Sequence, residues 1–299
     1  MNRPRRHSVA RPRTQQAPDI GVTAGTVSVR GRSVVVRSAG QPATGVTAGN
    51  SGRHRRVGFL HGLIGAPDGH PLLQAVAAQG PSAEFRLVAP CLPGFTGSEA
   101  DPTLRSMHDW VASLSELIDE TGLAGKPMVA ASVGAMLALE LLAIRPDVFS
   151  ELTLIAPFGL WDDDDPVADG FGATLGDQRR MLTANPEVTA PFFEDPDELT
   201  RGVVDTEALV DVGVERYVTR ATGASLVWPI PDHGLASRIH RVKVPCTLIW
   251  GGQDAIIPPS YLRRFSSHLV GTCSTAVLED AGHLAAWDNP SDVLDLIDF

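Results

Sequence analysis

The stretch Ala130-Ala131-Ser132-Val133-Gly134-Ala135 (AASVGA) follows an apolar run and precedes a segment rich in alanine and leucine. It has the form of a turn that presents a nucleophilic serine between a strand and a helix, usually written G-x-S-x-G, although alanine replaces the first glycine. An ordinary strand-to-helix connection that happens to contain a serine is the alternative. The rest of the chain has to decide between these two interpretations.

Strands and helices alternate on both sides of this turn. The β-rich runs 26–29 and 33–38 flank the tight turn Arg30-Gly31-Arg32. Further strands are expected at 57–60, 85–89, 127–131, 151–156, 247–250 and 274–279. Helices are expected near 70–79, 104–118 (with Leu104, Met107, Val111, Leu114 and Ile118 on one face), 133–144, 259–269 and 291–298. This alternation predicts an α/β fold with a mostly parallel sheet covered by helices on both faces.

The alternation lapses between residues 158 and 232, and a helical stretch near 205–222 lies inside this gap. We interpret 158–232 as an inserted helical lid or cap, 26–157 and 233–299 as the core, and 1–25 as a basic, disordered tail. The acidic run Asp162–Asp165 suggests a cation site, because hard cations prefer oxygen ligands. It lacks spaced ligands and a glycine turn, so a solvated turn is the favoured interpretation.

Composition limits the class of protein and its partners. The 299 residues are 43% hydrophobic and 20% charged, so a packed globular core is expected. The net charge is −10, yet residues 1–56 hold eleven arginines against the single acid Asp19, and the remainder therefore carries −20. An acidic body argues against nucleic acid as the main partner. The arginine-rich start is interpreted as a solvated tail, with a targeting arm or a nucleic-acid contact as the alternatives.

Membrane and redox signals are weak in this sequence. No apolar segment follows the first arginines as in a complete signal peptide, and no run approaches the ~20 apolar residues of a membrane span. The three cysteines, Cys91, Cys246 and Cys273, are widely spaced and form neither a metal-ligand pattern nor a disulfide framework. We therefore expect a cytoplasmic protein without metal or cofactor, and a homo-oligomer stays open.

Two residues downstream of Ser132 have the chemistry that a serine nucleophile needs. A serine hydroxyl requires a neighbouring base, and the base requires a group that fixes its tautomer. Asp254 follows the strand at 247–250, and His283 follows the strand at 274–279. Since the carboxyl ends of parallel strands meet at one sheet edge, all three residues are expected there. Alone, each has a simpler interpretation: a small turn residue for Ser132, a turn residue for Asp254, and a helix-start or packing residue for His283.

Two further motifs complete a family pattern. Phe59-Leu60-His61-Gly62-Leu63 matches an HG turn, and Ala89–Phe95 with Ser98 matches a loop usually written D-L-P-G-F-G-x-S. Together with the serine turn and the order Ser, Asp, His, these motifs make the sequence resemble the α/β-hydrolase fold family from about Thr26 to Phe299. The resemblance is to its lid-bearing branch, which includes serine esterases and meta-cleavage-product (C–C bond) hydrolases.

The resemblance implies an oxyanion hole made of main-chain N–H groups. Its donors would be the amides of Val133, directly after the nucleophile, and of Leu63 in the HG turn. His61 in that turn is expected to be structural and to transfer no proton. The sequence also departs from the family at several positions. Ala130 and Ala135 replace elbow glycines, Cys91 replaces an aspartate, and Thr96 replaces a glycine.

These features predict a serine hydrolase that cleaves an ester-like or otherwise activated carbonyl bond through an acyl-enzyme on Ser132. Four apolar cap residues suggest a small, partly hydrophobic substrate: Met181, Phe192, Phe193 and Trp228. A C–C bond hydrolase, a thioesterase or a lactonase with the same triad is the alternative. Ala131 and Leu284 stand where C–C hydrolases commonly have Asn and Trp, which counts against that activity. A ligand-binding protein with little turnover is the alternative of another class.

Overall fold

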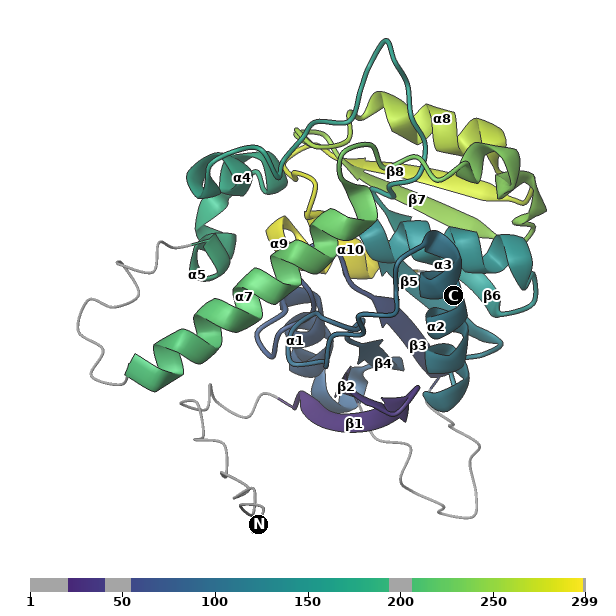
Figure 1. The fold of residues 1–299 in the computed structure, drawn as a ribbon. Coiled ribbons are helices and arrows are strands. Elements are labelled where there is room, and N and C mark those ends of the chain that lie inside the picture. Colours follow the sequence, from purple (N-terminus) through teal and green to yellow (C-terminus); the bar gives the residue numbers. More distant parts are fainter. Residues whose placement is uncertain (1–20, 41–54, 194–205, 298–299) are drawn as a thin grey trace, which may run out of the picture.

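The computed structural model describes residues 21–40, 55–193 and 206–297, and an eight-stranded sheet forms its centre (Figure 1). The strands are β1 Thr23–Val29, β2 Arg32–Ala39, β3 Arg55–Leu60, β4 Phe85–Pro90, β5 Lys126–Ala131, β6 Phe149–Ile155, β7 Cys246–Gly251 and β8 Cys273–Leu278. Their order across the sheet is β1-β2-β4-β3-β5-β6-β7-β8. The β1–β2 and β2–β4 pairs are antiparallel and the other neighbours are parallel. The predicted mostly parallel sheet is confirmed.

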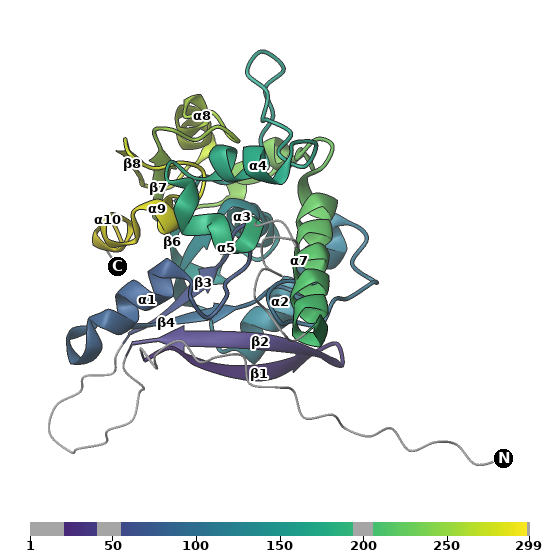
Figure 2. The same cartoon turned by 90° about the vertical axis from the view of Figure 1, so that its left-hand side faces the viewer.

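Helices cover both faces of this sheet (Figures 1 and 2). The helices of the core are α1 Pro71–Ala78, α2 Met107–Glu120, α3 Ser132–Ile144, α8 Ser260–His268, α9 Ala285–Asp288 and α10 Pro290–Asp295. Short 3₁₀ turns lie at Gly80–Ser82, Leu235–Ser237 and Ile239–Arg241. One apolar cluster joins the sheet to α2, α3 and α8, and a second cluster joins it to α1, α9 and α10. The two clusters are the two sides of one α/β sandwich.

Strand β5 shows why the sheet is buried on both faces. Met128 and Ala130 belong to the first cluster, whereas Val129 and Ala131 belong to the second. Successive side chains of a strand point to opposite faces, so a strand covered on both faces needs a continuous apolar run. Helix α3 follows directly and is buried at every position from 132 to 143. β5 and α3 therefore form the most enclosed part of the core.

Three of the expected helix boundaries were wrong, for local reasons. Leu104 precedes α2, because Ser106 caps the helix in a reciprocal capping box with Asp109 and the first helical residue is Met107. The helix expected at 291–298 is α10, which begins at Pro290 and ends at Asp295, and the short helix α9 before it was not expected. The helix expected near 205–222 extends to Val227. β1 also begins at Thr23, where the antiparallel register pairs it with Ser38.

Residues 158–232, which we call the cap, connect β6 to the last part of the core. Their described elements are α4 Leu175–Leu182, a 3₁₀ turn at Pro186–Thr189, α5 Ala190–Phe193 and α7 Thr206–Val227. Helix α7 crosses in front of the sheet in Figure 1, and α4 and α5 lie beside it. The predicted boundaries of core and cap, and the behaviour of the cap as a lid, stay predictions. The arginine-rich segment 1–20 lies outside the described residues.

Candidate active site

Ser132 occupies the junction between β5 and α3 in a strained backbone conformation. Its φ is 55°, in the left-handed region that few residues other than glycine adopt, and its side chain is fully buried. The Ser132 hydroxyl lies within hydrogen-bond distance of the His283 imidazole. A strained backbone of this kind is typical of a serine turn between a strand and a helix.

The single glycine of this turn is placed where the fold requires one. A Cβ atom on Gly134 would lie 2.5 Å from the carbonyl oxygen of His61 and 2.7 Å from that of Leu60. Ala130 and Ala135 are fully buried, and neither has a positive φ. The close approach between α3 and the end of β3 therefore occurs at Gly134, and the two alanines fit as ordinary strand and helix residues.

Ser132, His283 and Asp254 form one hydrogen-bonded chain. The Ser132 Oγ lies 2.8 Å from the His283 Nε2, and the His283 Nδ1 lies 2.9 Å from the Asp254 Oδ2. Because an ionised carboxylate only accepts hydrogen bonds, Nδ1 carries the proton and Nε2 is left to accept from the serine hydroxyl. All three side chains are buried. The structure thus brings together the three residues that the sequence singled out from separate strands.

Asp254 is held in place by its own loop. Its Oδ1 accepts hydrogen bonds from the backbone amides of Ile256 and Ile257, both at 2.8 Å, while Oδ2 faces the imidazole. The ring of Phe158 packs edge-on against the His283 imidazole, at 5.3 Å between centroids. Phe158 follows β6 and was not predicted from the sequence, where an isolated phenylalanine at the start of the cap has no distinctive pattern.

The HG turn lies directly against the serine. A Cβ atom on Gly62 would lie 3.0 Å from the Ser132 Cβ and 3.6 Å from its Oγ, so only glycine leaves the hydroxyl uncrowded. Leu63, the next residue, follows β3 at the same sheet edge. Val133 is in the first turn of α3, where backbone N–H groups have no partner within the helix. Both amides expected in the oxyanion hole thus come from segments that adjoin Ser132.

Two buried histidines near the site are structural. The His61 Nε2 accepts a hydrogen bond from the Leu92 amide at 2.9 Å, and its Nδ1 lies 2.9 Å from the Gly62 carbonyl oxygen. Burial lowers the pKa of His61 to about 4. The His70 Nδ1 accepts from the Leu72 amide and caps α1, and burial lowers its pKa to about 3. Both side chains are neutral at physiological pH, so neither supplies a charge to the site.

Cys91 and Thr96, which depart from the family pattern, are accommodated by their neighbours. The Cys91 Sγ lies 2.9 Å from the Arg37 Nη1, and burial raises the pKa of this thiol, so it stays neutral. Thr96 has a positive φ of 27°, and its Oγ1 accepts from the Ala66 amide. A Cβ atom on Gly65 would lie 2.4 Å from the Thr96 side chain. A glycine at 65 thus makes room for the threonine at 96.

The four cap residues named from the sequence differ in their surroundings. Met181, Phe192 and Phe193 are partly buried against the first apolar cluster, and the Phe192 ring packs edge-on against Trp287 at 5.0 Å. Trp228 is 58% exposed, and its Nε1 lies 3.3 Å from the Asp169 Oδ2. Their role in substrate binding stays a prediction, with the first three on the core side of the cap.

Helix α7 rests on the loops beside Ser132. Positions near its C-terminal half contact the HG turn and the loop after β4: a Cβ atom on Gly223 would lie 3.3 Å from Leu63, and one on Gly94 would lie 2.5 Å from Thr222. The Thr219 Oγ1 accepts from the Thr96 amide at 3.4 Å. The cap therefore covers the side of the site from which Leu63 comes.

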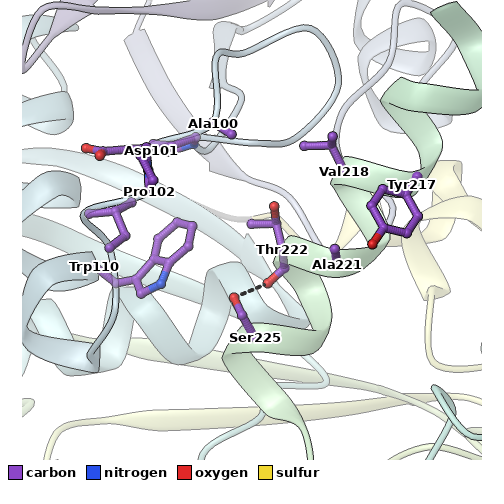
Figure 3. Close-up of a pocket in the computed structure, with 11 residues that line it drawn as sticks. Ala100, Asp101, Pro102, Trp110, Tyr217, Val218, Ala221, Thr222 and Ser225 are labelled. Carbon is purple, nitrogen blue, oxygen red and sulfur yellow. Dashed lines mark hydrogen bonds between the residues drawn. The ribbon is translucent and has the colours of Figure 1, made fainter.

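A separate hollow of about 290 Å³ lies between α7 and the segment that leads into α2 (Figure 3). Figure 3 shows Trp110 and Pro102 on one wall and Val218, Ala221, Thr222 and Ser225 of α7 on the other, with Tyr217 at the rim. None of Ser132, Asp254 and His283 lines it. The hollow thus lies between α7 and the core and is distinct from the serine site.

Two acidic residues of the run Asp162–Asp165 are bound to helix α8 of the core. Asp162 forms an ion pair with Arg264, and the Asp165 carboxylate accepts from the Ser260 hydroxyl at 2.5 Å. In the described ranges no group of three or more His, Cys, Asp or Glu side chains is arranged to hold a metal ion. No helix in the same ranges has the length and apolar character to span a membrane.

Comparison with known proteins gives one family. Residues 59–296 match the model of the "Alpha/beta hydrolase family". The dihydrolipoyllysine-residue acetyltransferase component of the acetoin cleaving system of Cupriavidus necator is 28% identical, over 82% of this chain and 63% of its own length. Monoacylglycerol lipase abhd6-B of Xenopus laevis is 26% identical, over 69% of this chain and 64% of its own. This chain thus spans somewhat under two thirds of these curated relatives.

Solved structures share the fold at low identity. The 2-hydroxy-6-oxo-6-phenylhexa-2,4-dienoate hydrolase of Rhodococcus sp. strain RHA1 superposes with a TM-score of 0.64 at 18% identity, covering 92% of this chain and 97% of that one. The expected fold, a mostly parallel sheet flanked by helices, is confirmed as the α/β-hydrolase fold.

Proposed function

The chain belongs to the alpha/beta hydrolase family, and we propose that it is a serine hydrolase that cleaves a carboxylic ester or a similarly activated carbonyl bond. The observation that carries this proposal is the buried chain from the Ser132 Oγ through His283 to Asp254, with links of 2.8 and 2.9 Å. The lipase name of one relative supports an ester as the substrate class.

The reaction begins at Ser132. As Oγ attacks the substrate carbonyl carbon, the hydroxyl proton passes to the His283 Nε2, which already lies within hydrogen-bond distance. Asp254 stabilises the imidazolium that forms, and two backbone amides keep its other oxygen in place. The substrate oxygen becomes negative at this stage. The amides of Val133 and Leu63 donate to it, as preorganised donors in a buried site.

The second half of the reaction releases the product. His283 returns the proton to the leaving alcohol, the carbon–oxygen bond of the ester breaks, and the acyl group stays on Ser132. Water then attacks the acyl carbon while His283 accepts its proton, and Ser132 leaves as the hydroxyl. Each proton is transferred to or from the same imidazole nitrogen, so the reaction needs no cofactor and no metal.

The surroundings favour an uncharged, partly hydrophobic substrate. The Phe158 ring packs on the His283 imidazole, Leu284 follows His283 and lies beside Gly62 of the HG turn, and the cap contributes Met181 and Phe192 from the core side. Apolar side chains of this kind stabilise an acyl chain or an aromatic ring by removing it from water. The proposed partner is a small molecule, and we further propose that the protein acts in the cytoplasm.

A fluorophosphonate probe tests the proposal, because it phosphonylates only a serine that a neighbouring base activates. The wild-type protein is expected to be labelled at Ser132, and Ser132→Ala is expected to give no label. Thr153→Ala, a buried hydroxyl on β6, serves as the matched control and is expected to be labelled like the wild type. Equal labelling of Ser132→Ala, or none of the folded wild type, would contradict a serine hydrolase.

A panel of substrates then separates the alternatives. Esters are expected to turn over fastest, and thioesters, lactones and a vinylogous diketone with a cleavable C–C bond are the competing arms. Ala131 and Leu284 flank Ser132 and His283 without the amide and indole side chains of C–C hydrolases. Faster cleavage of the diketone than of any ester would replace the ester proposal.

A further inference from the structure

Asp288 is a partly buried acceptor that connects the cap to the loop of His283. It is the last residue of α9, five positions after His283. Its Oδ2 accepts hydrogen bonds from the Gly282 amide at 2.8 Å and the Ala184 amide at 2.9 Å, and its Oδ1 accepts from the Asn185 amide at 3.1 Å. One carboxylate thus joins three backbone N–H groups from two segments that are about a hundred residues apart.

The two residues that flank His283 are both fixed by these contacts. Gly282 donates to Asp288, and the Leu284 amide donates to the Leu182 carbonyl oxygen at the end of α4, at 2.8 Å. The cap backbone also packs closely here, since a Cβ atom on Gly282 would lie 2.8 Å from the Ala184 nitrogen. The backbone on both sides of the imidazole is therefore attached, directly or through Asp288, to the end of α4 and the residues that follow it.

A carboxylate suits this position because it accepts several hydrogen bonds and donates none. Among the described residues, the Asp288 carboxylate has hydrogen bonds to the three amides above and none to Ser132 or to the imidazole of His283. Charge-assisted bonds to amides are among the stronger hydrogen bonds of a protein. Asp288 thus acts on the site through the backbone alone.

We propose that Asp288 is a positioning residue that couples the place of the cap to the place of the His283 imidazole. This inference rests on the proposed function, because it assigns His283 the part of the base. When Ala184 and Asn185 are in contact with Asp288, the loop before His283 is held so that Nε2 faces Ser132. When the cap segment moves away, the carboxylate loses two of its three partners and the loop gains freedom. When the cap closes on the substrate, the contacts of Ala184 and Asn185 with Asp288 also align the His283 imidazole.

Replacement of Asp288 tests this role through the rate of the chemical step. Asp288→Ala removes all three bonds, and kcat for an ester is expected to fall about 100-fold, the usual cost of a small misplacement of a catalytic group, while KM changes less than threefold. The rate of fluorophosphonate labelling of Ser132 is expected to fall in parallel. Asp292→Ala, which removes an exposed carboxylate of α10, is the matched control and should leave both rates unchanged.

Asp288→Asn keeps one acceptor oxygen and covers the case in which the alanine variant fails to fold. It is expected to lower kcat about tenfold, between the wild type and Asp288→Ala, with circular dichroism unchanged. A folded Asp288→Asn or Asp288→Ala protein with the wild-type kcat would overturn the proposal. A rise in KM at constant kcat would overturn it too, because that result belongs to substrate contact and not to alignment of the base.

Coupling to the cap is tested by changing Ala184, the cap partner of Asp288. Ala184→Pro deletes the donor amide at 184, and it is expected to lower kcat less than Asp288→Ala. In the double variant the two effects should not add, because both changes break the same contact. Additive losses would show that Asp288 acts without the cap. If Ser132→Ala keeps activity, the serine mechanism fails; if only the Asp288 variants behave like the wild type, that mechanism stands and the coupling fails.

Discussion

The sheet edge and the cap both contribute to the site, but they are built differently. At the sheet edge, Ser132, Asp254 and His283 follow β5, β7 and β8, and their side chains are buried and bonded to one another. In the cap, α7 exposes large apolar side chains: Val210, Val214 and Tyr217 are 61%, 56% and 73% exposed. On the proposed function, the sheet fixes the groups that break the bond, and the more exposed cap is the part expected to select the substrate.

The largest expected effect on kcat is at the sheet edge, where the nucleophile is removed. Ser132→Ala is expected to lower kcat at least about 1,000-fold, because residues of such a triad act as a unit. Steady-state kinetics on an ester measures this loss. Ser225→Ala on α7, a cap serine whose hydroxyl donates to the Thr222 carbonyl oxygen, is the matched control and should keep activity within twofold. Similar losses in both variants would mean that the sheet edge has no special role.

A glycine-to-alanine change should act in opposite directions in the two regions. Gly134→Ala places a methyl group against the Leu60 and His61 carbonyl oxygens and is expected to cost about 3 kcal/mol of unfolding free energy. Gly213→Ala on α7 meets no atom within 4 Å and is expected to stabilise by about 0.5 to 1 kcal/mol. Urea denaturation measures both. If both substitutions changed the free energy of unfolding in the same direction, the contrast between a close-packed core helix and a loosely packed cap helix would be wrong.

The core should also lose stability in mild acid through its buried histidines. The folded-state pKa of His70 is lowered from 6.5 to about 3, so the unfolded chain binds the proton first and stability falls as pH drops below 6.5. Between pH 6.5 and 5 the free energy of unfolding falls by about 2 kcal/mol for this reason, at about 1.36 kcal/mol per pH unit. His61, lowered to about 4, adds a similar loss.

His70→Asn separates this contribution, because asparagine can still cap α1 but does not titrate. Between pH 7.5 and 5, the free energy of unfolding of the variant should fall by about 2 kcal/mol less than that of the wild type. Urea denaturation at each pH measures it. His108→Asn, at an exposed position of α2, is the control and should follow the wild type. An unchanged pH dependence in His70→Asn would show that His70 is not the group responsible.

Much of the sheet edge could be predicted from the sequence, because its signals are local. A strand followed by a turn with Ser132, Asp254 or His283 can be recognised within about ten residues, and parallel strands bring such turns together. Contacts of the cap are not of this kind. The Asp288–Ala184 bond and the Gly65–Thr96 compensation join residues without a shared pattern. α4 was also missed, since an eight-residue helix with two buried side chains gives little periodicity.

Cap substitutions should have the smallest effects, and mainly on KM. Phe192→Ala removes an aromatic side chain that packs on Trp287, and it is expected to raise KM for long-chain esters three- to tenfold with kcat within twofold. Trp228→Ala, at the most exposed of the four predicted positions, is expected to change KM less than twofold. Kinetics on esters of increasing acyl length measures both. If Phe192→Ala lowered kcat as much as Asp288→Ala, Phe192 would act on the chemical step, and the assignment of the cap to substrate binding would be wrong.

The acyl-enzyme is the species that tests the account most directly. A p-nitrophenyl ester is mixed with the enzyme, the reaction is acid-quenched within its first turnovers, and intact mass and peptide mapping locate the acyl group. We predict one acyl group per chain on the peptide that contains Ser132, a burst of p-nitrophenol of the same amplitude, and neither in Ser132→Ala. Turnover with an acyl group on another residue, or undiminished turnover by Ser132→Ala, would contradict the account.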